Sequence, residues 1–144
     1  MPNSPQSGPI AGPTIAELTH SYRTSSLTPS EVIDQVLGRI AERGEDGTWI
    51  SVLDRGDLMI RAKELEQQVD PASLPLYGIP FGVKDSIDVA GVATTLACPD
   101  YSYQATATAP VVARLTRKCR QLDSANVISS SPPRLEPAAL IHSA

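Results

Sequence analysis

The stretch from Leu76 to Gly91 constrains this chain more than any other, because it is apolar, then abruptly charged, then apolar again. Side chains alternate between the two faces of a strand, so Phe81 and Val83 share one face of a short predicted strand. Lys84 falls where that strand would end. The pattern therefore predicts a short, largely buried strand that delivers a lysine to its carboxyl end.

Lys84 is expected to have either an acidic partner or a functional role, since an unpaired ammonium group on a buried strand is unfavourable. Asp85 and Asp88 are its nearest acidic neighbours in the sequence. From the residues alone, a structural ion pair at the strand end is favoured over a catalytic lysine. A charged group held in a cleft by a specific partner is also typical of active sites, so the catalytic interpretation stays open.

Two capping boxes mark helix starts before this stretch. Thr14 is followed by Glu17, and Thr28 by Glu31, which is the spacing of a reciprocal cap. The helix predicted over residues 28–43 is strongly amphipathic, with one apolar stripe at helical spacing. The stripe residues are Val32, Ile33, Val36, Leu37 and Ile40. Such a stripe indicates core or a subunit interface.

The remaining segments alternate between strand and helix patterns. Residues 49–53 are aromatic and β-branched, which predicts a short strand, and residues 55–69 return to helical spacing. Residues 87–92 are interpreted as a strand and turn, and residues 94–103 as a loop. A further helix is predicted to begin near Pro110.

Composition excludes several classes of function. The 144 residues suffice for one small domain, and 41% of them are hydrophobic. A net charge of −4 gives no reason to expect nucleic acid or an anionic membrane as partner, and no apolar run approaches the ~20 residues of a membrane span. Cys98 and Cys119 lack metal-ligand spacing. Free thiols of this kind predict a cytoplasmic protein.

The run from Gly78 to Asp85, which reads Gly-Ile-Pro-Phe-Gly-Val-Lys-Asp, resembles the N-terminal part of the amidase signature family. The continuation from Thr94 to Pro99, Thr-Thr-Leu-Ala-Cys-Pro, is similar to one branch of that family, the allophanate hydrolases. The earlier Trp-Ile-Ser run, residues 49–51, is similar to the same branch. Together these matches extend the resemblance from about residue 14 to about residue 115.

The resemblance implies an α/β fold, here the N-terminal fragment of the amidase-signature fold with helices at the front and the start of a mixed sheet. It also implies that Lys84 is the base of a Ser–cis-Ser–Lys triad, which must be neutral to accept a proton. The family substrate is a small-molecule amide, and no cofactor or metal is implied. Helices at this end of the family fold can join in dimer contacts, so a homodimer through the N-terminal helices is expected.

The resemblance stops near residue 116, and this divides the chain into three parts. Residues 1–13 are predicted to be a flexible tail, residues 14–116 the N-terminal part of an amidase domain, and residues 117–144 an unrelated, disordered tail. The two family serines come from a later Gly/Ser-rich segment that this sequence lacks. The serines at 129–131 are flanked by prolines and are interpreted as tail. A truncation or frameshift after about residue 116 would produce this pattern.

Three functions follow from these observations. The favoured one is an amidase-type hydrolase resembling allophanate hydrolase, which converts allophanate to ammonia and carbon dioxide in urea degradation. This chain alone is then expected to be inactive, because it keeps Lys84 without the serines. The second is an inactive remnant or a helical interaction module that uses the 28–43 helix. The third is a fragment of another amidase-signature enzyme, such as the amidase subunit of glutamyl-tRNA amidotransferase.

Overall fold

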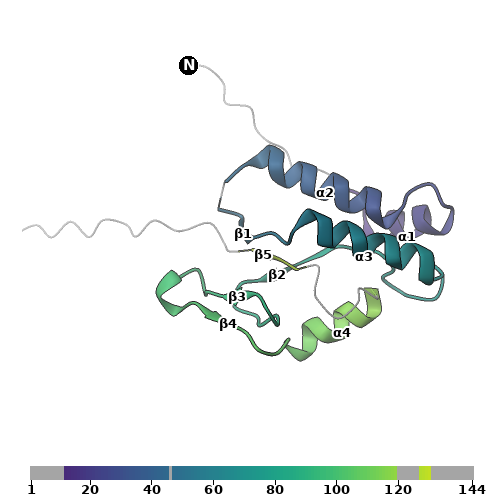
Figure 1. The fold of residues 1–144 in the computed structure, drawn as a ribbon. Helices are drawn as coiled ribbons and strands as arrows, with labels where there is room; N and C mark the ends of the chain where they lie inside the picture. Colours follow the sequence, from purple (N-terminus) through teal and green to yellow (C-terminus); the bar gives the residue numbers. More distant parts are fainter. Residues whose placement is uncertain (1–11, 46, 120–126, 131–144) are drawn as a thin grey trace, which may run out of the picture.

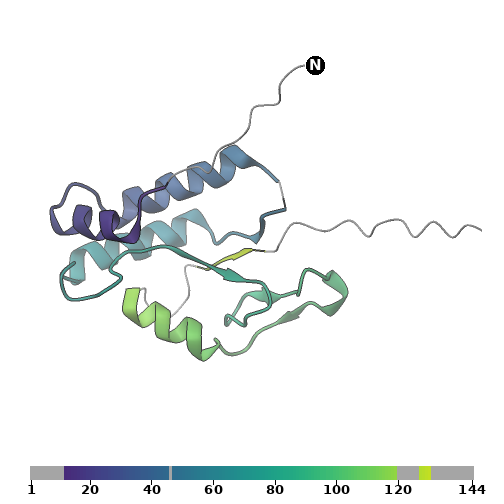
Figure 2. The same ribbon diagram turned by 180° about the vertical axis from the view of Figure 1, so that it is seen from behind.

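Helices lie on both sides of a small mixed sheet in the computed structural model of this chain, which describes residues 12–45, 47–119 and 127–130. Three helices lie on one side of the sheet and the fourth lies on the other, with a small hairpin beside it (Figures 1 and 2). The elements in order are α1 (Ile15–Arg23), α2 (Pro29–Arg43), β1 (Trp49–Ser51), α3 (Arg55–Gln68), β2 (Phe81–Lys84), β3 (Ala93–Thr94), the 3₁₀ turn η1 (Pro99–Tyr101), β4 (Tyr103–Gln104), α4 (Pro110–Cys119) and β5 (Val127–Ser130). The predicted α/β class is confirmed.

Both predicted capping boxes are present. The hydroxyl of Thr14 accepts from the amide of Glu17, whose carboxylate accepts from the Thr14 amide at 2.7 Å. Thr28 and Glu31 repeat the arrangement at the start of α2, where Pro29 occupies the first turn. Each box satisfies amides that have no partner within the helix, which fixes where the helix begins.

The apolar stripe of α2 is used mainly inside the chain. Ile33 packs against Leu58 and Ala62 of α3 in one buried cluster. The two helices are also joined at their polar edges, because the Glu66 carboxylate accepts from the Ser30 amide at 2.7 Å. The predicted helix over residues 55–69 thus forms and covers one face of its neighbour.

The three-stranded sheet has the order β1-β5-β2. β5 is antiparallel to β1 and parallel to β2, with Phe81 beside Val127 and Lys84 beside Ser130. This differs from the expected tail, because α4 continues to Cys119 and residues 127–130 form the central strand. The chain passes from β2 through α4 to the parallel β5, which is the usual connection of parallel strands. The rest of the expected tail and residues 1–11 lie outside the described residues.

Two core clusters hold β2 and its approach in place. Val83 packs with Val89 and with Val112 of α4, and Phe81 packs against the same cluster, so the predicted shared face of the strand is confirmed. On the approach to β2, the Tyr22 hydroxyl donates to the Gly78 carbonyl at 3.0 Å. The strand and its approach are therefore held by elements far apart in the sequence.

The segment after β2 corrects one prediction. Residues 87–92, interpreted as a strand and turn, form bends, turns and irregular backbone, while β3 and β4 pair as a short antiparallel hairpin at the two ends of the predicted 94–103 loop. The Asp88 carboxylate accepts from the hydroxyls of Thr94 and Tyr103, at 2.8 and 2.5 Å. These bonds draw both hairpin strands toward one turn, which local strand propensity does not reveal.

Candidate active site around Lys84

Lys84 is the last residue of β2 and lies on the face of the strand opposite the buried Val83. The alternation of apolar and polar residues predicted this position. The amine Nζ lies 3.2 Å from Oδ1 of Asp85, and half of the lysine side chain (50%) is exposed, whereas the Asp85 side chain is fully buried. The ammonium group thus lies at the sheet edge beside a buried carboxylate.

Asp85 uses its two oxygens for different partners. Oδ1 accepts from Lys84, and Oδ2 accepts from the Thr95 hydroxyl at 2.9 Å and from the Ala97 amide at 2.5 Å. Burial alone raises the pKa of this carboxyl, but the hydrogen bonds from Ala97, Thr95 and Lys84 outweigh it and hold the pKa below its ordinary value of 3.8. Asp85 is therefore ionised near neutral pH despite its burial.

The loop that Asp85 contacts is strained. Leu96 and Ala97 have φ angles of +53° and +59°, in the left-handed region that non-glycine residues rarely adopt. The sequence did not predict this link, because Thr-Leu-Ala contains no glycine to signal a left-handed turn. The only local indication of a buried carboxylate at this point was the aspartate that follows the strand lysine.

Asp88, the other expected partner of Lys84, serves the hairpin instead. Its carboxylate accepts from Tyr103 and Thr94, and these bonds hold its pKa below the ordinary value. The same contact raises the pKa of the Tyr103 phenol. Of the two aspartates, Asp85 is the one that contacts Lys84 among the described residues. The predicted ion pair of Lys84 is therefore formed with Asp85.

The serines of the predicted tail lie closer to the site than expected. Ser129 and Ser130 occupy the β5 register positions beside Val83 and Lys84. The third serine, Ser131, lies outside the described residues. The backbone register is what brings this segment to the lysine, and sequence reasoning could not supply it.

Other candidate residues lie apart from Lys84. His20 is exposed on α1. Cys119 is buried in α4, which raises the pKa of its thiol to about 11, and Cys98 is half-buried. Within the described ranges, His, Cys, Asp and Glu side chains form no group of three that could hold a metal ion.

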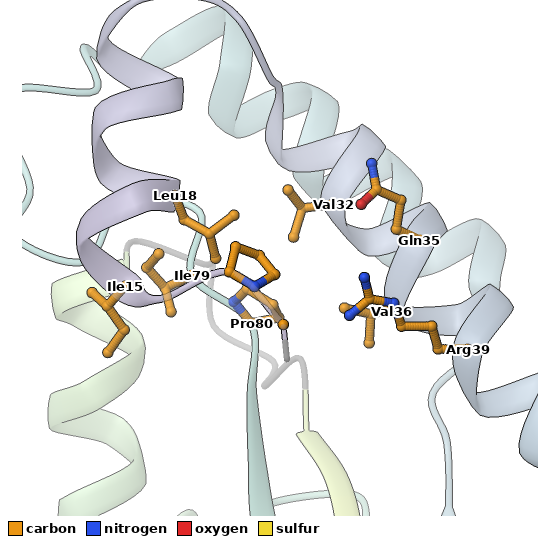
Figure 3. A pocket seen from close by; sticks show the side chains of 10 residues that line it. Ile15, Leu18, Val32, Gln35, Val36, Arg39, Ile79 and Pro80 are labelled. Carbon is orange, nitrogen blue, oxygen red and sulfur yellow. The ribbon is translucent and has the colours of Figure 1, made fainter. Parts of the chain in front are cut away.

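A cavity of about 270 Å³ lies at the opposite end of β2 from Lys84. Its walls come from α1, α2 and the Ile79–Pro80 approach to the strand, and they are mainly apolar (Figure 3). Arg39 and Gln35 supply its polar groups. Because β2 separates the two, this cavity is distinct from the Lys84 site.

Comparison with known proteins places this geometry in a family. The sequence profile of the family described as Amidase matches residues 31–119, which include most of α2, all of β2 and the Lys84–Asp85 pair. The chain belongs to the amidase family. The resemblance inferred from the run from Gly78 to Asp85 is thereby confirmed.

Among amidase relatives, the urea amidolyase of Saccharomyces cerevisiae is 40% identical over 89 residues, covering 62% of this chain and 5% of that protein. One glutamyl-tRNA(Gln) amidotransferase subunit, from Staphylococcus carnosus, is 31% identical over 86 residues, covering 58% of this chain and 18% of that one. The allophanate hydrolase structure from Kluyveromyces lactis has a TM-score of 0.60 and 33% identity, covering 83% of this chain and 19% of its own. This amidase chain thus spans a small part of each relative.

No helix in the described part of the chain is both long and apolar enough to cross a membrane.

Proposed function

We propose that this chain carries the front part of an amide-hydrolysing site of the allophanate hydrolase type, with Lys84 as its base. The observation that carries the proposal is the placement of the family motif. The run from Gly78 to Asp85 delivers Lys84 to the end of β2, where one buried carboxylate fixes it. The greater identity to the urea amidolyase, 40% against 31%, favours allophanate over the substrate of the amidotransferase.

In the proposed reaction, Lys84 accepts the proton of a serine hydroxyl through a bridging serine, while the nucleophilic serine adds to the amide carbonyl carbon. The C–N bond then breaks, the proton leaves with the nitrogen as ammonia, and water hydrolyses the acyl group left on the serine. The proton transfer to Lys84 requires a neutral amine, whereas the described residues leave half of the Lys84 side chain exposed beside a carboxylate. We therefore assign the serines and the surface that covers Lys84 to sequence beyond the matched segment.

The interaction-module alternative is less well supported. Ile33 and Val32 of α2 are buried within this chain, against α3 and the α1 cluster. A homodimer through the N-terminal helices stays part of the proposal. Ile15 on α1, which is 55% exposed, is an apolar residue available for such a contact.

The proposal is tested by measuring ammonia release from allophanate and, in a separate assay, from glutamine. Two proteins are compared: the 144-residue chain, and a chimera in which residues 31–119 replace the matching segment of the K. lactis allophanate hydrolase. We expect the chimera to release ammonia from allophanate and the chain alone to release none. The unmodified K. lactis enzyme is the positive control.

Two outcomes would overturn this assignment. A chimera that hydrolyses glutamine but not allophanate would assign the segment to the amidotransferase type. Ammonia release by the 144-residue chain alone would show that the nucleophile lies within it, and residues 129–131 would be the first to substitute.

A further inference from the structure

The Asp85 carboxylate accepts hydrogen bonds from both Lys84 and the loop of residues 95–97. Its side chain has no solvent exposure, so neither oxygen is satisfied by bulk water. A buried carboxylate of this kind is stable only while its donors stay in place. Lys84 and the loop are therefore held through one shared acceptor.

The loop needs this acceptor because its backbone is strained. Two successive non-glycine residues with positive φ are unfavourable by about 1–2 kcal/mol each. The short bond from the Ala97 amide to Asp85, together with the bond from the Thr95 amide to the Asp85 carbonyl at 3.3 Å, offsets that strain. In this conformation Leu96 is exposed, at 55% of its accessible surface.

The geometry points to Asp85 as a positioning residue that locks Lys84 and the 95–97 loop into one unit. Oδ1 orients the amine and Oδ2 fixes the loop, so the distance between base and loop is set by one carboxylate. This inference deepens the proposed function and rests on it for the role of Lys84 as base. The coupling itself is a property of the chain that is measurable without catalysis.

Because Oδ1 and Oδ2 have different partners, the lysine contact and the loop contact can be removed by separate substitutions. In Asp85→Asn, the carboxamide oxygen keeps its place toward the Ala97 and Thr95 donors, and the NH₂ group then faces Lys84, where it cannot accept. Thr95→Val removes one loop donor and leaves the lysine contact intact. Asp88→Asn is the matched control, because its carboxylate is close in sequence but bonds Thr94 and Tyr103 instead.

The test uses the 144-residue chain. Trace acetylation of Lys84, relative to the exposed Lys63, reports the lysine contact, and hydrogen exchange of the Ala97 amide reports the loop. We expect Asp85→Asn to raise Lys84 acetylation about threefold or more while Ala97 stays protected, since the opposite charge is gone. We expect Thr95→Val to speed Ala97 exchange about fivefold, the effect of one lost hydrogen bond, without changing acetylation.

A second measurement needs no variant. In the parent chain, protonation of Asp85 should shift the NMR resonances of the Ala97 amide and of the Lys84 ε-methylene together, because both groups contact the same carboxylate. Both shifts should have one midpoint, below pH 3.8. Separate midpoints would overturn the inference. So would unchanged acetylation in Asp85→Asn, or an equal rise in Asp88→Asn.

The catalytic consequence is measured in the chimera. Mispositioning the base acts on the chemical step, so Asp85→Asn should lower kcat at least about tenfold with KM within about threefold. A rise in KM at unchanged kcat would contradict a positioning role. A chimera without any activity would count against the proposed function, while the acetylation and exchange results would still decide the coupling.

Discussion

Gly78→Ala should destabilise this chain more than Gly91→Ala or Gly38→Ala, because a Cβ at Gly78 would meet other side chains at close range. Gly78 has φ of +64°, where a residue with a Cβ is strained by about 1–2 kcal/mol. The new Cβ would lie 2.7 Å from Cγ of Pro29 and 3.3 Å from Cε2 of Tyr22. The proline ring is stiff, and overpacking of a core costs a further 1–3 kcal/mol or so. The expected loss in the free energy of unfolding is therefore about 2–5 kcal/mol.

Two other glycines serve as controls for this prediction. Gly91 has φ of +79°, and a Cβ added there would meet nothing within 4 Å, so Gly91→Ala should cost only the backbone strain of about 1–2 kcal/mol. Gly38 lies in α2 with the same open surroundings, and Gly38→Ala should stabilise by about 0.5–1 kcal/mol. Urea unfolding followed by Trp49 fluorescence measures all three. A Gly78→Ala protein no less stable than Gly91→Ala would refute the packing argument.

Three further predictions follow from the structure. Because the pKa of Asp85 is lowered on folding, its contribution to stability is present above about pH 3.8 and is lost as the pH falls below that value. The difference in unfolding free energy between the parent and Asp85→Asn should therefore narrow in acid. Cys119 is 1% exposed and its pKa is raised to about 11, so only about one part in a thousand is thiolate at pH 8. Iodoacetamide should therefore modify Cys98 first, and equal rates by mass spectrometry would contradict the burial of Cys119. Thr28→Ala should cost about 1 kcal/mol in urea unfolding by removing the cap of α2, and an unchanged midpoint would count against that cap.

The elements that sequence reasoning predicted are those fixed by local chemistry. The two capping boxes begin α1 and α2 where Thr14 and Thr28 indicated, because a cap involves residues three apart. The strand from Phe81 to Lys84 followed from side-chain alternation. The role of Lys84 as base stays a prediction, and it rests on a contiguous motif.

The features that were missed depend on partners distant in the sequence. Residues 127–130 form the central strand because β1 and β2 flank them, and no residue in that segment reveals such pairing. The β3–β4 hairpin depends on Asp88 reaching Tyr103, fifteen residues away. Likewise, the contact from Asp85 to Ala97 exists only once the chain has turned back on itself.

The most direct test of the account is the catalytic role of Lys84 in the allophanate-hydrolysing chimera. Lys84→Met removes the amine and keeps the length of the side chain, and Lys63→Met, at an exposed position of α3, is the control. The account predicts that Lys84→Met lowers kcat about a thousandfold or more while Lys63→Met stays within about threefold of the parent. Ammonia release from Lys84→Met at the rate of the parent would contradict it.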